Sequence, residues 1–156
     1  MKKLIESLIT KIYYQQRSSY YQQIFLSSPS LLRHIPEPLI RFGGFEFNYH
    51  IYGRASHREC YSLSNSRIYE HIIYLNQWFL NLLMGGENIP ADFTFNKLIE
   101  AIAHEVAHCL MFDFYPQHTQ KHEDSIYKQV CKELLEILEN DALVAKLEKE
   151  FEELLR

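Results

Sequence analysis

The segment from Thr94 to Phe112 is the part of the sequence that most restricts the fold, because its two sides differ in polarity. Drawn as a helix that turns 100° per residue, it gathers its large apolar side chains within about 120° of arc on one side. His104 and His108 lie on the opposite side, about 40° apart around the axis. This pattern predicts a helix that begins at a Thr94 N-cap, packs one face in a core and presents the other face to a site.

The two histidines belong to the pattern His-Glu-x-x-His, formed by residues 104–108. Histidines four residues apart on a helix point the same way, so their imidazoles can bind one zinc ion. Glu105 between them can act as the general base towards a water molecule at the metal. A five-residue pattern also arises by chance, so two surface histidines on an ordinary helix remain the alternative.

A catalytic zinc site requires a third protein ligand and leaves a fourth position open. The candidates follow the helix, and His122 is favoured because it stands at the start of a further predicted helix with Tyr127 nearby. His118 and Glu123 remain alternatives. The candidate hydrogen-bond partners for the far ring nitrogens of the ligands are Glu100, Asp113 and Asp124.

Apolar periodicity predicts five helices, at about residues 2–26, 78–84, 94–112, 122–139 and 141–155. Apolar and polar residues alternate from Phe45 to Ile51, which indicates a strand there. A second β-rich run extends from Arg67 to Leu75, and the polar segment between these runs has room for a further strand. Residues 27–41 contain three prolines and are expected to be irregular or only briefly helical.

These elements predict one α+β domain over residues 1–156, with a core from about residue 5 to residue 136. A chain of this length is enough to bury a sizeable core, and no internal repeat or linker divides it. We expect the acidic C-terminal helix, residues 141–155, to dock on the domain through one apolar stripe. Binding of a protein partner or dimerisation through this helix is the alternative.

The net charge of −4 is unevenly distributed. Residues 1–67 carry nine Lys or Arg against four Asp or Glu, whereas residues 68–156 carry seven against sixteen. The acidic total does not favour a nucleic-acid-binding protein. A surface that binds a substrate or a nucleic acid remains an alternative, and the residues that could form it are Arg54, Arg58 and Arg67. No apolar run reaches the roughly 18 residues of a membrane span, so we expect no membrane insertion.

The number and spacing of the cysteines indicate a protein of a reducing compartment. Cys60, Cys109 and Cys131 are odd in number, far apart in sequence and form no Cys-x-x-Cys pair. This predicts neither a disulfide framework nor a zinc ribbon, and it favours a cytoplasmic protein. Cys109 and Cys131 fall at apolar helix positions, where we expect them to act as small buried hydrophobes.

On these residues the chain resembles the SprT-like zinc metallopeptidases, the group that includes the Spartan-type proteases. The resemblance covers about residues 5–136: an N-terminal helix, a small β-region that ends in Ile-Tyr-Leu-Asn (73–76), the His-Glu-x-x-His helix and a later third histidine. It implies a zincin-like fold. The Zn²⁺ ligands and the catalytic base that it implies are His104, His108, His122 and Glu105.

The resemblance implies a zinc-dependent endopeptidase that hydrolyses peptide bonds of a polypeptide substrate, with Tyr127 as a candidate donor to the oxyanion. Spartan-type proteases act on proteins bound to DNA, which keeps the nucleic-acid alternative open. A second resemblance, to the ImmA/IrrE-like metallopeptidases, would make Glu123 the third ligand. A non-catalytic zinc-binding interaction module with the same fold is a further alternative.

For the other histidines and the tyrosine-rich part of the first helix, we expect structural roles. The histidines expected to be surface or hydrogen-bonded side chains rather than ligands are His34, His50, His57 and His71. The tyrosine-rich part of the first helix, residues 13–21, is expected to pack in the core with its polar tips at the surface.

Overall fold

The computed structural model describes residues 2–27, 37–48, 51–61, 67–115 and 124–155. Within these residues the chain forms five helices and a three-stranded sheet, which confirms the predicted α+β class. The strands are β1 (Glu37–Glu46), β2 (Gly53–Tyr61) and β3 (Arg67–Asn76). The helices are α1 (Lys2–Ser27), α2 (Gln77–Leu83), α3 (Phe95–Phe114), α4 (Ser125–Glu139) and α5 (Ala142–Leu154).

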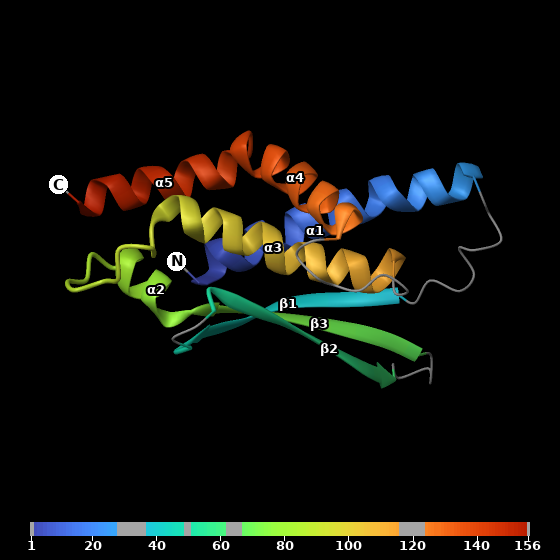
Figure 1. Cartoon of the computed structure of the whole chain (residues 1–156), viewed down its shortest axis with the longest axis horizontal. Coiled ribbons are helices and arrows are strands. Elements are labelled where there is room, and N and C mark those ends of the chain that lie inside the picture. Colours follow the sequence, from blue (N-terminus) through green and yellow to red (C-terminus); the bar gives the residue numbers. More distant parts are fainter. Residues whose placement is uncertain (1, 28–36, 49–50, 62–66, 116–123, 156) are drawn as a thin grey trace.

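The strands lie in the order β1-β3-β2, with β1 parallel and β2 antiparallel to the central strand. Because side chains alternate along a strand, His71, Ile73 and Leu75 of β3 share one face, and all three are fully buried. The helices cover this face, with α3 next to the strands and α4 and α5 beyond it (Figure 1). Strand β2 is therefore both an edge of the sheet and a neighbour of α3.

Strand β1 corrects two predictions about the region after α1. The alternation from Phe45 to Ile51 predicted a strand there, but β1 begins at Glu37 and ends at Glu46. Its first residues fall in the segment for which the prolines predicted irregular structure. The strand passes through a bulge at Gly44, where φ is +114°, and pairs in parallel with the distant strand β3. Local alternation does not reveal such a distant partner. The strand expected between the two β-runs is present as β2.

Helix α3 lies at the centre of the core, as its pattern predicts. Leu98, Ile102 and Val106 are fully buried and belong to one cluster with Ile5 and Ile9 of α1. The helix therefore has its apolar face fixed by packing on both the sheet and α1. Its opposite face carries the two histidines.

Side chains cap the N-termini of four helices; at α2, the side-chain oxygen of Asn76 accepts a hydrogen bond from the backbone N–H of Trp78. The hydroxyl oxygen of Thr94 accepts a hydrogen bond from the backbone N–H of Lys97 at 3.1 Å, which confirms the predicted N-cap of α3. Asp124 accepts from the backbone N–H groups of Ile126 and Tyr127, so α4 begins at Ser125 and not at residue 122 as predicted. An equivalent carboxylate cap begins α5.

Helix α5 packs on the domain through an apolar stripe, which confirms its predicted docking. Val144 and Leu147 are buried, and the ring of Phe151 stacks on that of Phe95 with centroids 5.7 Å apart. In the part of the chain that the structure describes, no helix combines the length and apolar character of a membrane span. The two cysteines predicted to be buried, Cys109 and Cys131, are buried and free.

Candidate functional site

A cleft of about 640 Å³ opens between α3 and the edge strand β2. Gly53, Ala55 and His57 of β2 face α3, because they pair with the inward-facing residues of β3. The wall formed by α3 carries His104 and His108. The lining residues are Ile51, Tyr52, Gly53, Arg54, Ala55, His57, Lys97, Glu100, Ala101, His104, Glu105 and His108.

The imidazoles of His104 and His108 converge on one atom, the hydroxyl oxygen of Tyr127 in α4. This oxygen lies 3.1 Å from Nδ1 of His104 and 3.2 Å from Nε2 of His108. It also donates its proton to the backbone carbonyl oxygen of His104 at 3.1 Å, so its lone pairs can accept from both rings. Burial raises the pKa of Tyr127 well above its ordinary value, so the hydroxyl stays neutral. The thiol of Cys131 lies 3.7 Å from Nδ1 of His104.

Glu105 lies between the histidines in sequence and points towards β2. Its side chain is only 8% exposed, and burial raises its pKa from 4.5 to about 7. Gly53 makes this position available: a β-carbon there would lie 3.2 Å from Cγ of Glu105 and 2.8 Å from the carbonyl oxygen of Tyr74. The carboxyl group therefore occupies a low-dielectric part of the cleft, where it can hold a proton near neutral pH.

The structure brings together four of the predicted site residues. His104, Glu105 and His108 line one cleft, and Tyr127 contacts both histidines from α4. The third-ligand candidates lie outside the described residues: His118, His122 and Glu123.

The acidic residues expected to support the histidines have other described contacts. Asp113 accepts a hydrogen bond from Nε2 of His71 at 2.8 Å, and Glu100 pairs with Lys97 at 3.1 Å. Asp124 caps α4. Through this cap it fixes the helix turn that carries Tyr127.

A second polar cluster, missed by sequence reasoning, lies at one end of the cleft. His57 and His71 are directly opposite on β2 and β3, and their Nδ1 atoms are 2.8 Å apart. His71 is bonded in turn to Asp113, whose other carboxylate oxygen accepts a hydrogen bond from Tyr13 of α1. Burial, with a smaller contribution from the neighbouring His71, lowers the pKa of His57 to about 4. One signal could have indicated this pairing. His57 and His71 are equally far along the sequence from residues 62–66, which connect the two strands.

Comparisons with protein-family models, with curated proteins and with solved structures found no match to this chain.

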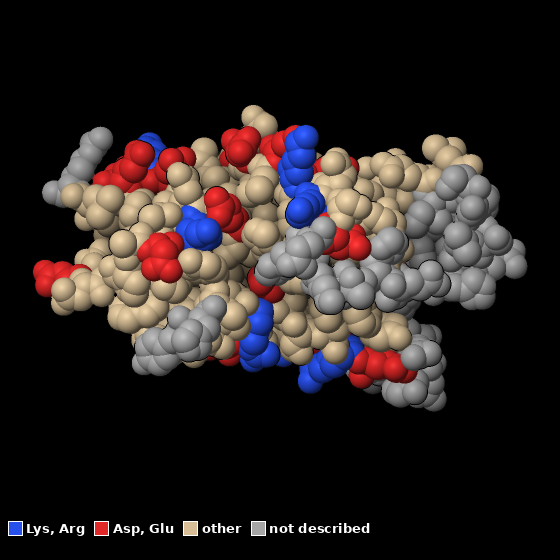
Figure 2. Space-filling view, in the orientation of Figure 1, with Lys and Arg blue, Asp and Glu red and all other residues tan. Residues whose placement is uncertain are grey.

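The arginines of the sheet are paired with carboxylates. Glu70 of β3 accepts from Arg41 at 2.5 Å and from Arg58 at 2.7 Å, across the face of the sheet turned away from the helices. Arg54 pairs with Glu46 at 2.5 Å. The side chain of Arg67 is not described. The face in Figure 2 likewise shows positive and negative side chains interspersed, with no single basic patch among the coloured residues.

Proposed function

We propose that this protein is a zinc-dependent peptidase of the SprT-like type, with a zincin-like arrangement of its helix and sheet. One observation carries the proposal. His104 and His108 reach a common atom on one side of α3, while the buried carboxyl of Glu105 stands in the same cleft against β2. A helix that presents two imidazoles and one base to a cleft has the groups that metal-assisted hydrolysis requires.

The donor set fits zinc. Two neutral imidazoles from successive turns of a rigid helix are ordinary zinc ligands, and their convergence on the Tyr127 hydroxyl shows that both can reach one point. His104 and His108 would hold the ion, with His122 as the third ligand and Glu123 or His118 as alternatives. When bound, the ion would polarise the scissile carbonyl group and lower the pKa of a water molecule.

Glu105 is suited to move the proton in this reaction. A general base works best when its pKa is near the working pH, and burial raises the pKa of this carboxyl to about 7. Glu105 would take a proton from the attacking water molecule and deliver it to the departing amine. The same low-dielectric position strengthens its interaction with any charge that develops in the cleft.

The wall of the cleft formed by β2 is suited to a polypeptide substrate. β2 is an edge strand of the described sheet, and the residues that it turns towards Glu105 are small or neutral: Gly53, Ala55 and His57. An extended chain can lie along an edge strand and bond to its backbone, which suits cleavage at an unstructured segment.

The proposal is tested with the variant Glu105→Gln. Wild-type protein purified without chelator should contain zinc and cleave an unstructured test protein. Glu105→Gln should retain the zinc and lose activity by about 10²–10⁴-fold, the usual contribution of a general base. His104→Ala is the matched control, because it should lose both the zinc of this site and the activity.

Two results would contradict the proposal. Cleavage by Glu105→Gln at the wild-type rate would show that this residue is not the base. A zinc-loaded wild-type protein that cleaves no unstructured protein would indicate a non-catalytic binding module.

A further inference from the structure

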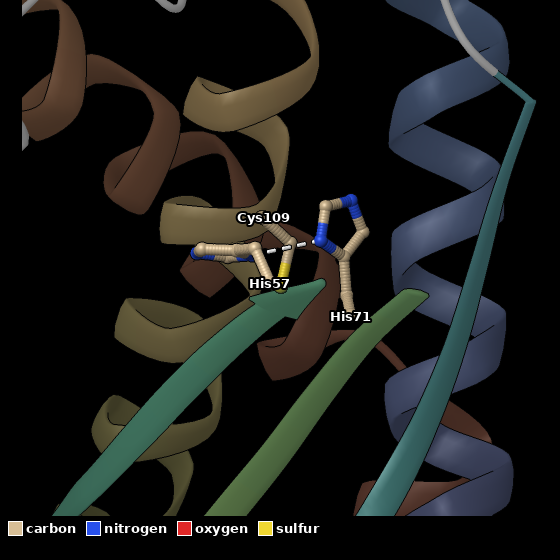
Figure 3. A group of neighbouring side chains, drawn as sticks. All are labelled: His57, His71 and Cys109. Carbon is tan, nitrogen blue, oxygen red and sulfur yellow. Dashed lines mark hydrogen bonds between the residues drawn. The ribbon is translucent and has the colours of Figure 1, made fainter. Parts of the chain in front are cut away.

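The cluster at the end of the cleft contains a thiol as well as the two histidines. One ring nitrogen of His57, one of His71 and Sγ of Cys109 all lie within 4.8 Å of one another. Figure 3 shows the three side chains turned towards one another, the histidines from the adjacent strands β2 and β3 and the cysteine from α3. Two consecutive strands and a later helix thus place three potential metal ligands around one point.

We propose that His57, His71 and Cys109 form a second transition-metal site, which binds Zn²⁺ separately from His104 and His108. Imidazole and thiolate ligands select zinc and other borderline or soft metals over calcium and magnesium, which require oxygen ligands. The site does not depend on the proposed peptidase activity, since none of its three ligands belongs to the first pair.

The surroundings of His71 are those of a metal-bound histidine. A ligating imidazole commonly donates its other ring N–H to a carboxylate, which fixes the ring and its tautomer. Nε2 of His71 lies 2.8 Å from Oδ1 of Asp113, and both side chains are fully buried. Tyr13 donates a hydrogen bond to the second oxygen of Asp113. When His71 donates its Nε2 proton in the hydrogen bond to Asp113, the lone pair on its Nδ1 is directed at His57 and Cys109.

The charges of the site would balance. A Zn²⁺ ion bound by the thiolate of Cys109, next to the carboxylate of Asp113, forms an assembly without net charge, which lowers the cost of burial. In the metal-free state, a proton between the two Nδ1 atoms accounts for their separation of 2.8 Å. On metal binding, the Nδ1 proton of His57 moves to the Nε2 atom of the same ring, both Nδ1 lone pairs bind the ion, and the thiol proton is released.

The ligand atoms must shift to bind a metal. Ligand atoms bound to tetrahedral zinc at about 2.0–2.3 Å are about 3.3–3.8 Å apart, so the two nitrogens must separate by roughly 0.5 Å, and a nitrogen–sulfur distance of up to 4.8 Å must shorten by up to roughly 1 Å. His57 can supply this movement, because it is half-buried and stands on an edge strand. Its ring lies flat against Phe112 of α3, with centroids 4.6 Å apart, which keeps it directed at the cluster.

Such an ion would join the two walls of the cleft. His57 belongs to β2, whereas Cys109 directly follows His108 on α3. A bond from each to one metal would limit how far the edge strand can move from the helix, and so would set the width of the cleft beside Glu105.

The test uses cobalt as a spectroscopic probe of metal-depleted full-length protein. Cobalt bound to a thiolate gives a charge-transfer absorption that cobalt bound only to imidazole and carboxylate does not give. We expect two equivalents of Co²⁺ to bind, with a thiolate band that excess Zn²⁺ removes. Cys109→Ser should abolish the band and one equivalent of binding. Cys131→Ser, a change at the other buried cysteine and near His104, should leave both unchanged.

His104→Ala separates this site from the first one. It should lose one equivalent of cobalt and any peptidase activity while it keeps the thiolate band. Absence of the band, or loss of the band in Cys131→Ser instead of Cys109→Ser, would overturn the second site. A single equivalent that carries the Cys109-dependent band would support the second site and contradict the first. If Cys109→Ser does not fold, X-ray absorption of the wild-type zinc protein decides, since a sulfur neighbour at about 2.3 Å must be present and must persist in Cys131→Ser.

Discussion

Gly53 and Glu105 approach each other so closely that a β-carbon on the glycine would lie 3.2 Å from Cγ of the glutamate. The strand and the helix therefore meet at the one residue that the proposed reaction uses as a base. The absence of a side chain at residue 53 allows the carboxyl group to remain buried and still border the cleft.

Gly53→Ala should disturb both stability and activity. The new β-carbon would lie 2.8 Å from the carbonyl oxygen of Tyr74, so the backbone must shift, at a cost of about 1–3 kcal/mol. A displacement of Glu105 by about 1 Å would lower the cleavage rate by roughly 100-fold. Gly85→Ala is the control: it strains a residue with φ of +72° in open space, so it should cost about 1–2 kcal/mol without loss of activity. Equal activities of the two variants would contradict the proposed contact.

The stability of the metal-free protein should depend on pH through Glu105. Burial raises the pKa of this carboxyl from 4.5 to about 7, so the folded state keeps its proton between these values while the unfolded state releases it. The contribution of Glu105 to the unfolding free energy therefore decreases as pH rises from about 4.5 to about 7 and is constant above that. The change amounts to about 3 kcal/mol.

Glu105→Gln isolates this contribution. In urea unfolding with a chelator present, the variant should be the more stable protein by up to about 3 kcal/mol at pH 8. The advantage should disappear at about pH 4, where both states of the wild type are protonated. An advantage independent of pH would show that the carboxyl does not titrate as inferred.

Tyr127→Phe should weaken zinc binding at the first site. The change removes the hydroxyl that contacts His104 and His108 at 3.1 and 3.2 Å but keeps the ring in place. Loss of a group that orients metal ligands typically lowers metal affinity 10–100-fold, which competition with a chromophoric chelator can measure. Unchanged affinity together with a large fall in kcat would instead assign this hydroxyl to the oxyanion, the role that the sequence predicted.

Tyr13→Phe should destabilise the protein by about 1–3 kcal/mol. It removes a hydrogen bond to the buried carboxylate of Asp113 and leaves one oxygen without that donor. The neighbouring change Tyr14→Phe is a matched control, because Tyr14 is 40% exposed and its substitution should alter stability by less than about 0.5 kcal/mol. Equal urea midpoints for the two variants would contradict a stabilising role of this bond.

The third zinc ligand can be identified by comparing three alanine variants. His122→Ala should lose the zinc of the first site, whereas His118→Ala and Glu123→Ala should retain it. Zinc analysis of His104→Ala provides the reference for loss of the zinc of the first site. Loss of zinc only in Glu123→Ala would favour the carboxylate ligand of the ImmA/IrrE-like metallopeptidases.

Helix α3 and its site face could be predicted because the determining information is local. Its apolar residues recur at helical spacing, Thr94 supplies the cap, and His104 and His108 are close in sequence. The structure places these two histidines and Glu105 in one cleft, as this local pattern indicated.

Strand β1 and the second cluster could not be predicted in the same way, because they depend on contacts between distant residues. Pro38 and the two glycines of β1 suggest a loop, yet pairing with β3 makes this segment a strand. The absence of a side chain at Gly43 leaves room for the ring of Tyr74. The contact between His57 and His71 depends on the β2–β3 register, and their contact with Cys109 depends on how α3 crosses the sheet.

Because β2 is an edge strand, the residues that can select the substrate lie on a different element from those proposed to act on the peptide bond. The groups proposed to act on the peptide bond share one helix, whose other face is fixed in the core, so they can hardly adapt to a new substrate. Among the described residues, the facing strand pairs with a single strand and lines the same cleft with Arg54 and Ala55. Exchanging residues along this strand is thus a route by which evolution or a designer could redirect the protein to other polypeptides while its reactive helix stays unchanged.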